Sequence, residues 1–426
     1  MHYELIIDLP VPKRSSFIDR FFSPFTAGGI RQSMFTLISA AIGGGILCLP
    51  YVFSLVGVML GIVILAFSSA LAFISMRMLL FSAERTQVFS YGKLFAQSME
   101  FRVAGPFLDV VTMMFGQGVV IAYFVFLGDF LPSLAGALGI NLARTVSILG
   151  ACILATPLVI PHRLSALKYL TPVSTLSLIV TAIVVLYKTP SMRSSLSEGS
   201  NRIDVVICSW SVLKAFAICL SSFICHTNVV SVAGELVKPT DARSTKIALR
   251  AALVQLVLYV TIGVSGYLSF SQTIQQNFLK GYSANDHLIT LCRLLLSLTI
   301  FFGLPLNTNP TAKALVNLVQ SVQVMTFDPL LPATPSDNTD PMRTTRIIAG
   351  LCVLTLGAIV SLFVPGIGDV IGLLGGTLGV LIMLVFPAFI FMKVFSEDMH
   401  STTNKLLVLA LLVAAVLCFS SVCMRV

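Results

Sequence analysis

Long stretches without a charged residue dominate this sequence, and short charged segments separate them. Charge is costly in the bilayer core and a helix needs about 20 apolar residues to cross it, so charge-free gaps locate membrane spans. The gap between Arg31 and Arg77 holds 45 uncharged residues, enough for two helices with a hairpin near Ser54 to Gly57. Nine further gaps each fit one helix: Asp109–Asp129, Arg144–Arg163, Lys168–Lys188, Lys214–Glu235, Arg250–Lys280, Arg293–Lys313, Arg346–Asp369, Asp369–Lys393 and Lys405–Arg425.

The pattern therefore predicts an all-α polytopic membrane protein with about eleven transmembrane helices. Only 11% of the residues are charged, whereas a soluble domain carries about 25%. We expect a short polar tail over residues 1–30 and one transmembrane domain over residues 31–426, embedded in the lipid bilayer as a monomer.

The basic residues predict the orientation. Eleven spans place the two termini on opposite sides of the membrane, and cytoplasmic segments are enriched in Lys and Arg. With a cytoplasmic N-terminus, 19 of the 27 Lys and Arg residues fall on the cytoplasmic side. This asymmetry also accounts for the net charge of +9, so the charge requires no nucleic-acid partner.

Two predicted spans contain residues that interrupt a helix. Span 1 carries Gly43, Gly44 and Gly45, and span 6 carries the polar stretch 225–228. The breaks are offset by five spans, an odd number, so the two halves have opposite topology. This is the plan of a five-plus-five inverted repeat, in which broken helices at matching positions indicate the binding site. We place repeat 1 at about 33–188, repeat 2 at about 209–394 and an extra helix at about 405–424.

The first break is suited to binding a ligand through its backbone. Glycine permits an unwound chain and close approach of a ligand, and the freed N–H and carbonyl groups can hold a carboxylate and an amine. We predict that Gly43, Gly44, Gly45 and Ile46 bind the substrate. The alternative is close helix packing, because small residues are common at membrane helix interfaces.

The second break places polar side chains at mid-span. Such groups usually serve function, so we predict that His226, Thr227 and Asn228 bind the substrate and that His226 faces the cavity. The alternative is a neutral His226 bonded to a neighbouring helix. One Cys-His pair is not a zinc ligand set, and we expect no metal and no cofactor beyond a coupling ion.

Several motifs resemble the amino acid/auxin permease family, most of all its system A and system N neutral amino acid transporters. These motifs run in the family's order from Met34 to Lys393: Gly43-Gly44-Gly45-Ile46-Leu47-Cys48-Leu49-Pro50-Tyr51, Gly128-Asp129-Phe130-Leu131-Pro132, Phe223-Ile224-Cys225-His226, Gly234-Glu235-Leu236, Gly266-Tyr267-Leu268-Ser269-Phe270, Pro305 with Pro310, Asp369-Val370-Ile371-Gly372 and Phe386-Pro387-Ala388. The resemblance implies an eleven-span fold of the five-plus-five inverted-repeat type, and a free amino acid bound between spans 1 and 6, often driven by Na⁺ or H⁺.

Two departures from the family pattern concern the coupling ion. Ser39 stands where sodium-coupled members carry an Asn, and the segment before Pro305 lacks their Thr. Ser297 and Thr299 lie a turn or more earlier and can replace it only if the register slips. We name Ser39, Ser297 and Thr299 as ion-site residues, and the missing ligands favour H⁺ coupling or uncoupled transport over Na⁺.

The sequence thus predicts a secondary active transporter of free amino acids. The alternative is an amino-acid sensor with a transporter fold. An enzyme is not expected, because no paired carboxylates, His cluster or nucleophile–base set occurs in one loop. We expect the plasma membrane or an acidic vacuole or lysosome as its location.

Overall fold

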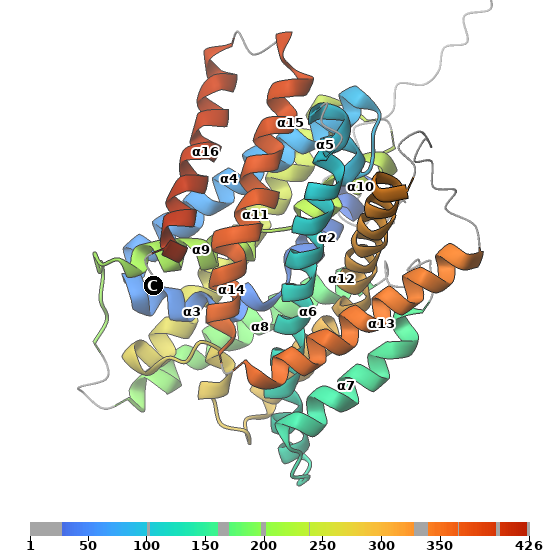
Figure 1. Cartoon of the computed structure of the whole chain (residues 1–426). Helices are drawn as coiled ribbons and strands as arrows, with labels where there is room; N and C mark the ends of the chain where they lie inside the picture. Colours follow the sequence, from blue (N-terminus) through green and yellow to red (C-terminus); the bar gives the residue numbers. More distant parts are fainter. Residues whose placement is uncertain are drawn as a thin grey trace, which may run out of the picture.

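The computed structural model describes residues 28–99, 103–160, 170–196, 202–237, 239–327, 340–364, 366–397 and 401–423, and regular structure in these ranges is entirely helical (Figure 1). Most of the predicted tail, residues 1–30, lies outside them. The helices are α2 Ile30–Ala41, α3 Gly44–Val56, α4 Val58–Thr86, α5 Tyr91–Met99, α6 Ala104–Ala137, α7 Arg144–Val159, α8 Leu170–Ser194, α9 Ser211–Ser222, α10 His226–Glu235, α11 Asp241–Phe270, α12 His287–Phe327, α13 Asp340–Phe363, α14 Ile367–Leu374, α15 Phe386–Val394 and α16 Thr402–Cys423.

These helices fit the predicted spans. Nine candidate spans in the described residues are long and apolar enough to cross a membrane, and the α2–α3 pair, bent by 63°, makes a tenth. The shorter apolar helix α7 takes the place of the predicted fourth span. Two π-helical segments, Gly375–Gly379 and Leu381–Val385, join α14 to α15 within span 10. The prediction of an all-α polytopic membrane protein is confirmed.

The predicted hairpin between spans 1 and 2 turns at Gly57. Its φ of 83° lies in the left-handed region, which glycine adopts without the penalty of a Cβ. A Cβ here would also lie 2.7 Å from the backbone of Val205, which packs across the turn. The turn therefore requires glycine on two independent grounds.

The two long helices α6 and α12 pack against each other along much of their length (Figure 1). Small residues allow this approach, as is common between membrane helices. A Cβ on Gly116 would overlap the hydroxyl of Thr311, and one on Gly303 would come within 2.9 Å of the Tyr123 ring. This pair forms one wall of the cavity described below.

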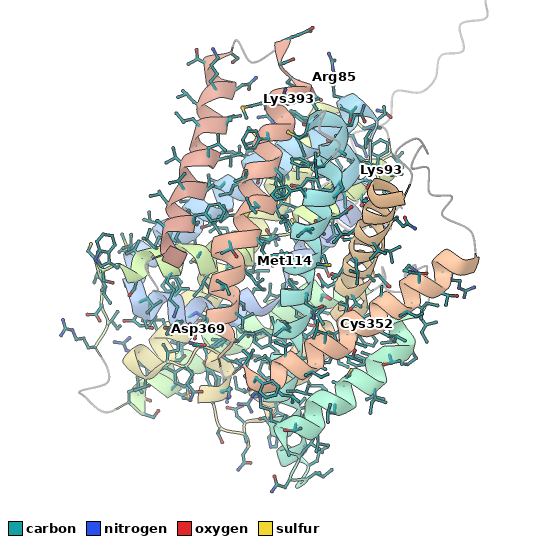
Figure 2. All side chains as sticks on the ribbon, viewed as in Figure 1. Arg85, Lys93, Met114, Cys352, Asp369 and Lys393 are labelled. Atoms are coloured by element: carbon teal, nitrogen blue, oxygen red, sulfur yellow. The ribbon has the colours of Figure 1, made fainter. Side chains whose placement is uncertain are left out.

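Labelled residues mark the two ends of the bundle. Arg85, Lys93 and Lys393 lie at one end, and Asp369 lies at the other (Figure 2). The first described residue, Gly28, belongs to the basic end, where its carbonyl accepts from the N–H of Val237 at 3.0 Å. We call this end the N-terminal side and the end with Asp369 the opposite side.

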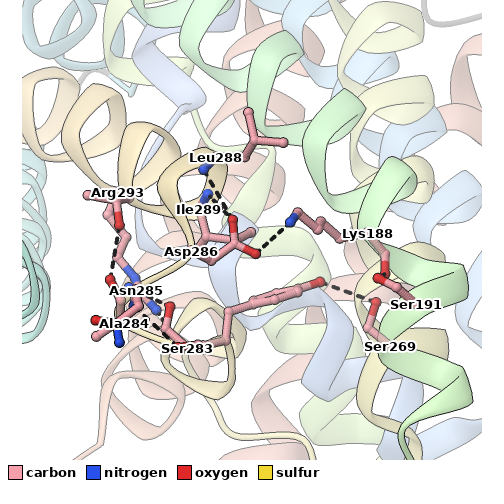
Figure 3. Close-up of polar contacts among 12 residues, drawn as sticks. Lys188, Ser191, Ser269, Ser283, Ala284, Asn285, Asp286, Leu288, Ile289 and Arg293 are labelled. Carbon is pink, nitrogen blue, oxygen red and sulfur yellow. Dashed lines mark hydrogen bonds and ion pairs between the residues drawn. The ribbon is translucent and has the colours of Figure 1, made fainter. Parts of the chain in front are cut away.

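On the opposite side, polar contacts fasten the loop between α11 and α12 (Figure 3). Lys188 of α8 pairs with Asp286 at 2.6 Å. The buried Arg293 donates to the carbonyls of Leu279 and Tyr282, both at 2.8 Å. The loop is thus held to α8 and to the start of α12.

Candidate functional site

The first break leaves Ile42 and Gly43 outside any helix, between α2 and α3. The N–H of Ile42 still bonds to the carbonyl of Ile38 at 3.1 Å and closes α2. At the start of α3, Gly43 provides no side-chain cap. The first N–H groups of a helix have no partner within it and, with the helix dipole, favour an anion. The break therefore offers N–H donors that have no partner within α3.

A cavity of about 70 Å³ lies beside this break. Residues from α2, α3, α6, α9, α10, α12 and α14 enclose it. They are Ala40, Ala41, Gly43, Gly44, Gly45, Phe115, Val119, Ala122, Tyr123, Ser221, Ile224, Thr227, Asn228, Asn307, Ile371 and Leu374. No lining residue in the described part of the chain carries a formal charge, so the cavity suits a ligand without net charge.

The three glycines of the first break have different surroundings. A Cβ on Gly43 would meet the Tyr123 ring at 3.5 Å, which is an ordinary contact. A Cβ on Gly44 would lie 2.4 Å from Phe126, and one on Gly45 would lie 2.3 Å from the Ser222 hydroxyl. All three glycines line the cavity, and Gly44 and Gly45 also allow close packing. Substrate binding by these glycines stays a prediction.

A polar network that the sequence analysis missed adjoins the first break. The hydroxyl of Tyr123, on α6, donates to the carbonyl of Ile42 at 3.3 Å. The Asn307 amide, on α12, donates to that hydroxyl at 3.4 Å and to the Gly303 carbonyl at 3.0 Å. The sequence held one signal for it, since Asn307-Thr308-Asn309 is a polar stretch within an apolar span.

The second break spans Phe223 to Cys225, between α9 and α10. The hydroxyl of Tyr259, on α11, donates to the carbonyl of Ser222 at 2.9 Å. The Cys225 thiol lies 3.5 Å from the sulfur of Met76, on α4. The surrounding helices thus hold this break through buried contacts on the side away from the cavity.

His226 lies on this buried side. Its side chain is fully buried, and its Nε2 lies 2.7 Å from the hydroxyl of Ser75 on α4. His226 is not among the cavity-lining residues. The expectation that it faces the cavity is wrong, and the alternative of a histidine bonded to a neighbouring helix describes its position. The next two residues, Thr227 and Asn228, do line the cavity.

The other predicted site residues lie away from the cavity wall. Ile46 is 2% exposed and packs in the core. Thr299 bonds to the Leu295 carbonyl of its own helix at 2.9 Å, and the Ser297 hydroxyl is buried without a hydrogen-bond partner. Ser39 is half-buried in α2. None of these four residues lines the cavity, and the proposed ion site of Ser39, Ser297 and Thr299 stays a prediction.

Comparison with known proteins agrees with this architecture. The family model for the transmembrane amino acid transporter protein family matches residues 26–426. A Toxoplasma gondii protein named "Putative amino acid transporter AAT1" is 33% identical over 307 residues, which are 71% of this chain and 42% of that protein. The chain therefore spans less than half of that relative. The vacuolar amino acid transporter 5 of Schizosaccharomyces pombe is 22% identical over 90% of both chains.

A solved structure has a similar fold. The crystal structure of MhsT in complex with L-phenylalanine matches with a TM-score of 0.58 at 14% identity. The match covers 94% of this chain and 99% of that one. At this identity the likeness concerns the fold alone.

Proposed function

The chain belongs to the transmembrane amino acid transporter protein family, and from this premise we propose that it is a secondary active transporter that moves free amino acids by alternating access. Amino acid transport follows from the family. The observation that carries the mechanism is the uncharged cavity at the first break, where unpaired helix N–H groups lie beside the Tyr123 hydroxyl. Transport makes it a membrane carrier rather than an enzyme.

The cavity suits a zwitterionic amino acid. The N–H groups at the start of α3 are donors for the carboxylate. Carbonyl groups at the break and the side-chain oxygens of Thr227 and Asn228 are acceptors for the ammonium group. The apolar residues Phe115, Val119 and Leu374 remain for the side chain of the substrate. A cationic or anionic substrate would lack a counter-charge in this lining.

Contacts on both sides of the cavity support alternating access. On the N-terminal side, Gly28 pairs with Val237, and the ring of Phe89 packs against Gly234. On the opposite side, Lys214 of α9 pairs with Asp369 of α14 at 2.9 Å. Transport requires that each set of contacts opens while the other stays closed.

The proposal also concerns the ion that drives transport and the membrane in which the protein lies. We infer that transport is driven by H⁺ or is uncoupled, because Ser39 and the segment before Pro305 lack the ligands expected for Na⁺. Relatives named vacuolar amino acid transporters support a vacuolar or lysosomal membrane, with the plasma membrane as the second location. We retain the cytoplasmic N-terminus from the distribution of basic residues.

Flux into liposomes tests the proposal. Purified protein is reconstituted, and uptake of each labelled amino acid is measured in Na⁺ and in choline medium at two pH values. We expect saturable uptake of zwitterionic amino acids that persists in choline. A steep Na⁺ requirement at constant pH would overturn the coupling proposal. Saturable binding without flux would identify a sensor and overturn the transport proposal.

A further inference from the structure

A second and larger cavity, of about 330 Å³, lies on the N-terminal side of the bundle. It is enclosed by the second half of α4, the start of α11, the end of α15 and the start of α16. Its lining residues are Phe73, Ile74, Arg77, Met78, Phe81, Asp241, Phe391, Phe395, Asn404 and Leu407. None of them lines the cavity at the first break, so this is a separate feature.

Arg77 is a cation with an incomplete set of partners in this cavity. Its Nε is buried and has no hydrogen-bond partner. Its guanidinium carbon lies 4.8 Å from the centroid of the Phe81 ring. The face of the ring attracts the cation, but it is not a hydrogen-bond acceptor for all of the guanidinium N–H groups. Among the described residues, no ion pair joins it to a carboxylate. A guanidinium has five donors suited to phosphate, and Arg77 lines this cavity beside several apolar side chains.

Asp241 supplies the opposite charge in the same cavity without neutralising Arg77. It is the exposed first residue of α11. The cap of that helix is the Thr240 side chain, which accepts from the Arg243 N–H, so the Asp241 carboxylate is not needed as the cap. The cavity thus carries separate positive and negative groups that are not paired with each other, and a zwitterionic ligand is complementary to both.

The remaining lining residues are suited to an acyl chain. Phe73, Phe391 and Phe395 form an apolar wall beside the two charges. The outer boundary is α16, the least buried of the candidate spans, with 28% of its apolar window buried. This helix borders lipid, so a chain can enter from the bilayer. The cavity lies at the same end as Arg85 and Lys393 (Figure 2), and basic side chains at the ends of membrane helices reach toward the lipid headgroups.

We propose that this cavity binds an ethanolamine phospholipid from the leaflet on the N-terminal side. The phosphate binds Arg77, the ammonium binds Asp241, and one acyl chain lies over the phenylalanines. An anionic headgroup without an amine fits less well because it meets the Asp241 carboxylate. A choline headgroup also fits less well because its methylated nitrogen has no N–H to donate to that carboxylate.

Native mass spectrometry of the full chain tests this proposal. The protein is exchanged into nanodiscs that contain equal parts phosphatidylethanolamine, phosphatidylcholine and phosphatidylglycerol, and the lipids retained after release are counted. We expect retention of phosphatidylethanolamine to be at least several-fold above the other two. Arg77→Gln should abolish this preference, and Asp241→Asn should shift it to phosphatidylglycerol. The control is Arg85→Gln, an exposed arginine on the same helix, which should retain the wild-type preference.

Two results would overturn the proposal. One is equal retention of the three lipids by the wild-type protein, or loss of the preference in Arg85→Gln as well as in Arg77→Gln. The other is displacement of the lipid by millimolar free amino acid in wild-type protein but not in Asp241→Asn, which would identify a second amino-acid site. Each variant is first checked by size-exclusion chromatography. If Arg77→Gln is misfolded, the shift toward phosphatidylglycerol in Asp241→Asn decides the matter.

Discussion

The two helix breaks occupy matching places in the two repeats, yet their environments differ. At each break, a tyrosine from a neighbouring helix donates to a freed carbonyl: Tyr123 to Ile42 and Tyr259 to Ser222. Tyr123 lines the cavity, whereas Tyr259 is fully buried away from it. Matching topology therefore does not imply matching chemistry. The first break has both of its non-helical residues beside Tyr123 at the cavity, whereas at the second break Ile224 reaches the cavity and the neighbouring Ser222 carbonyl is held by buried Tyr259.

The largest effect is expected from alanine substitutions at Gly45 and Gly43, because the space around these two glycines differs. Gly45→Ala places a methyl group against Ser222, whose backbone Cα would lie 3.0 Å away, and so forces the two breaks apart. Overpacking of this kind costs about 1–3 kcal/mol, so we expect a several-fold loss of folded protein in fluorescence-detected chromatography. The control, Gly43→Ala, has room for its methyl group and should keep normal abundance but transport more slowly. Equal abundance of both variants would contradict this packing.

Variants at His226 and Asn228 test the two faces of α10, the helix that follows the second break. His226→Ala removes a fully buried side chain and leaves a void, so we expect markedly lower abundance and an unchanged pH profile of the remaining uptake. Asn228→Ala should keep its abundance and raise KM, because this residue lines the cavity. A flattened pH profile at normal abundance in His226→Ala would restore the interpretation of His226 as a residue of the cavity.

The two tyrosines allow a matched comparison of the two carbonyls. Tyr123→Phe removes one hydroxyl from the cavity wall, and a hydrogen bond contributes about 0.5–1.5 kcal/mol, so KM should rise by up to about 10-fold. Tyr259→Phe should lower the melting temperature and leave KM unchanged, since its hydroxyl bonds only to Ser222 among the contacts of the described residues. Similar changes of KM in both variants would mean that the breaks are equivalent.

The smallest effect concerns Asp286, which is remote from both breaks. Burial alone would raise its pKa, but hydrogen bonds from Lys188 and from the N–H groups of Ile289 and Leu288 outweigh burial and hold the pKa below its usual value. The stabilising form is ionised, so its contribution is present above about pH 4 and is lost as the pH falls through the lowered pKa. Asp286→Asn should therefore lower the melting temperature slightly and equally from pH 8 to 5. A gap that closes between pH 7 and 5 would contradict this sign.

Much of the fold could be predicted from the sequence, because hydrocarbon excludes charge and the gaps between charges therefore mark the spans. Gly57 and the glycines at 43–45 were also recognisable, since few residues turn or unwind so readily. The orientation of His226 was not predictable. A polar residue at mid-span faces either a cavity or a neighbouring helix, and only the position of Ser75 on α4 decides between them.

Tyr123 and Asn307 were missed for a related reason. Each lies on a long apolar helix. The polar stretch 307–309 marks Asn307 as unusual, but the sequence does not show which partner either side chain meets. Their role depends on the packing of α6 against α12, which brings the Asn307 amide to the Tyr123 hydroxyl and that hydroxyl to Ile42. Pattern analysis of a single sequence does not reveal which faces of two helices meet.

Cysteine accessibility tests the central claim, that the cavity at the first break holds the amino acid and that His226 lies behind it. Asn228→Cys and His226→Cys are made in a background in which three cysteines are replaced by serine. Two of them are the exposed Cys208 and Cys352, and the third is Cys423. Labelling by a small methanethiosulfonate is followed with and without a transported amino acid. We predict that the cysteine at position 228 is labelled and that amino acid protects it, whereas the cysteine at position 226 stays unlabelled in folded protein. Labelling at position 228 that is unaffected by a saturating substrate, or substrate-protected labelling at position 226, would contradict the account.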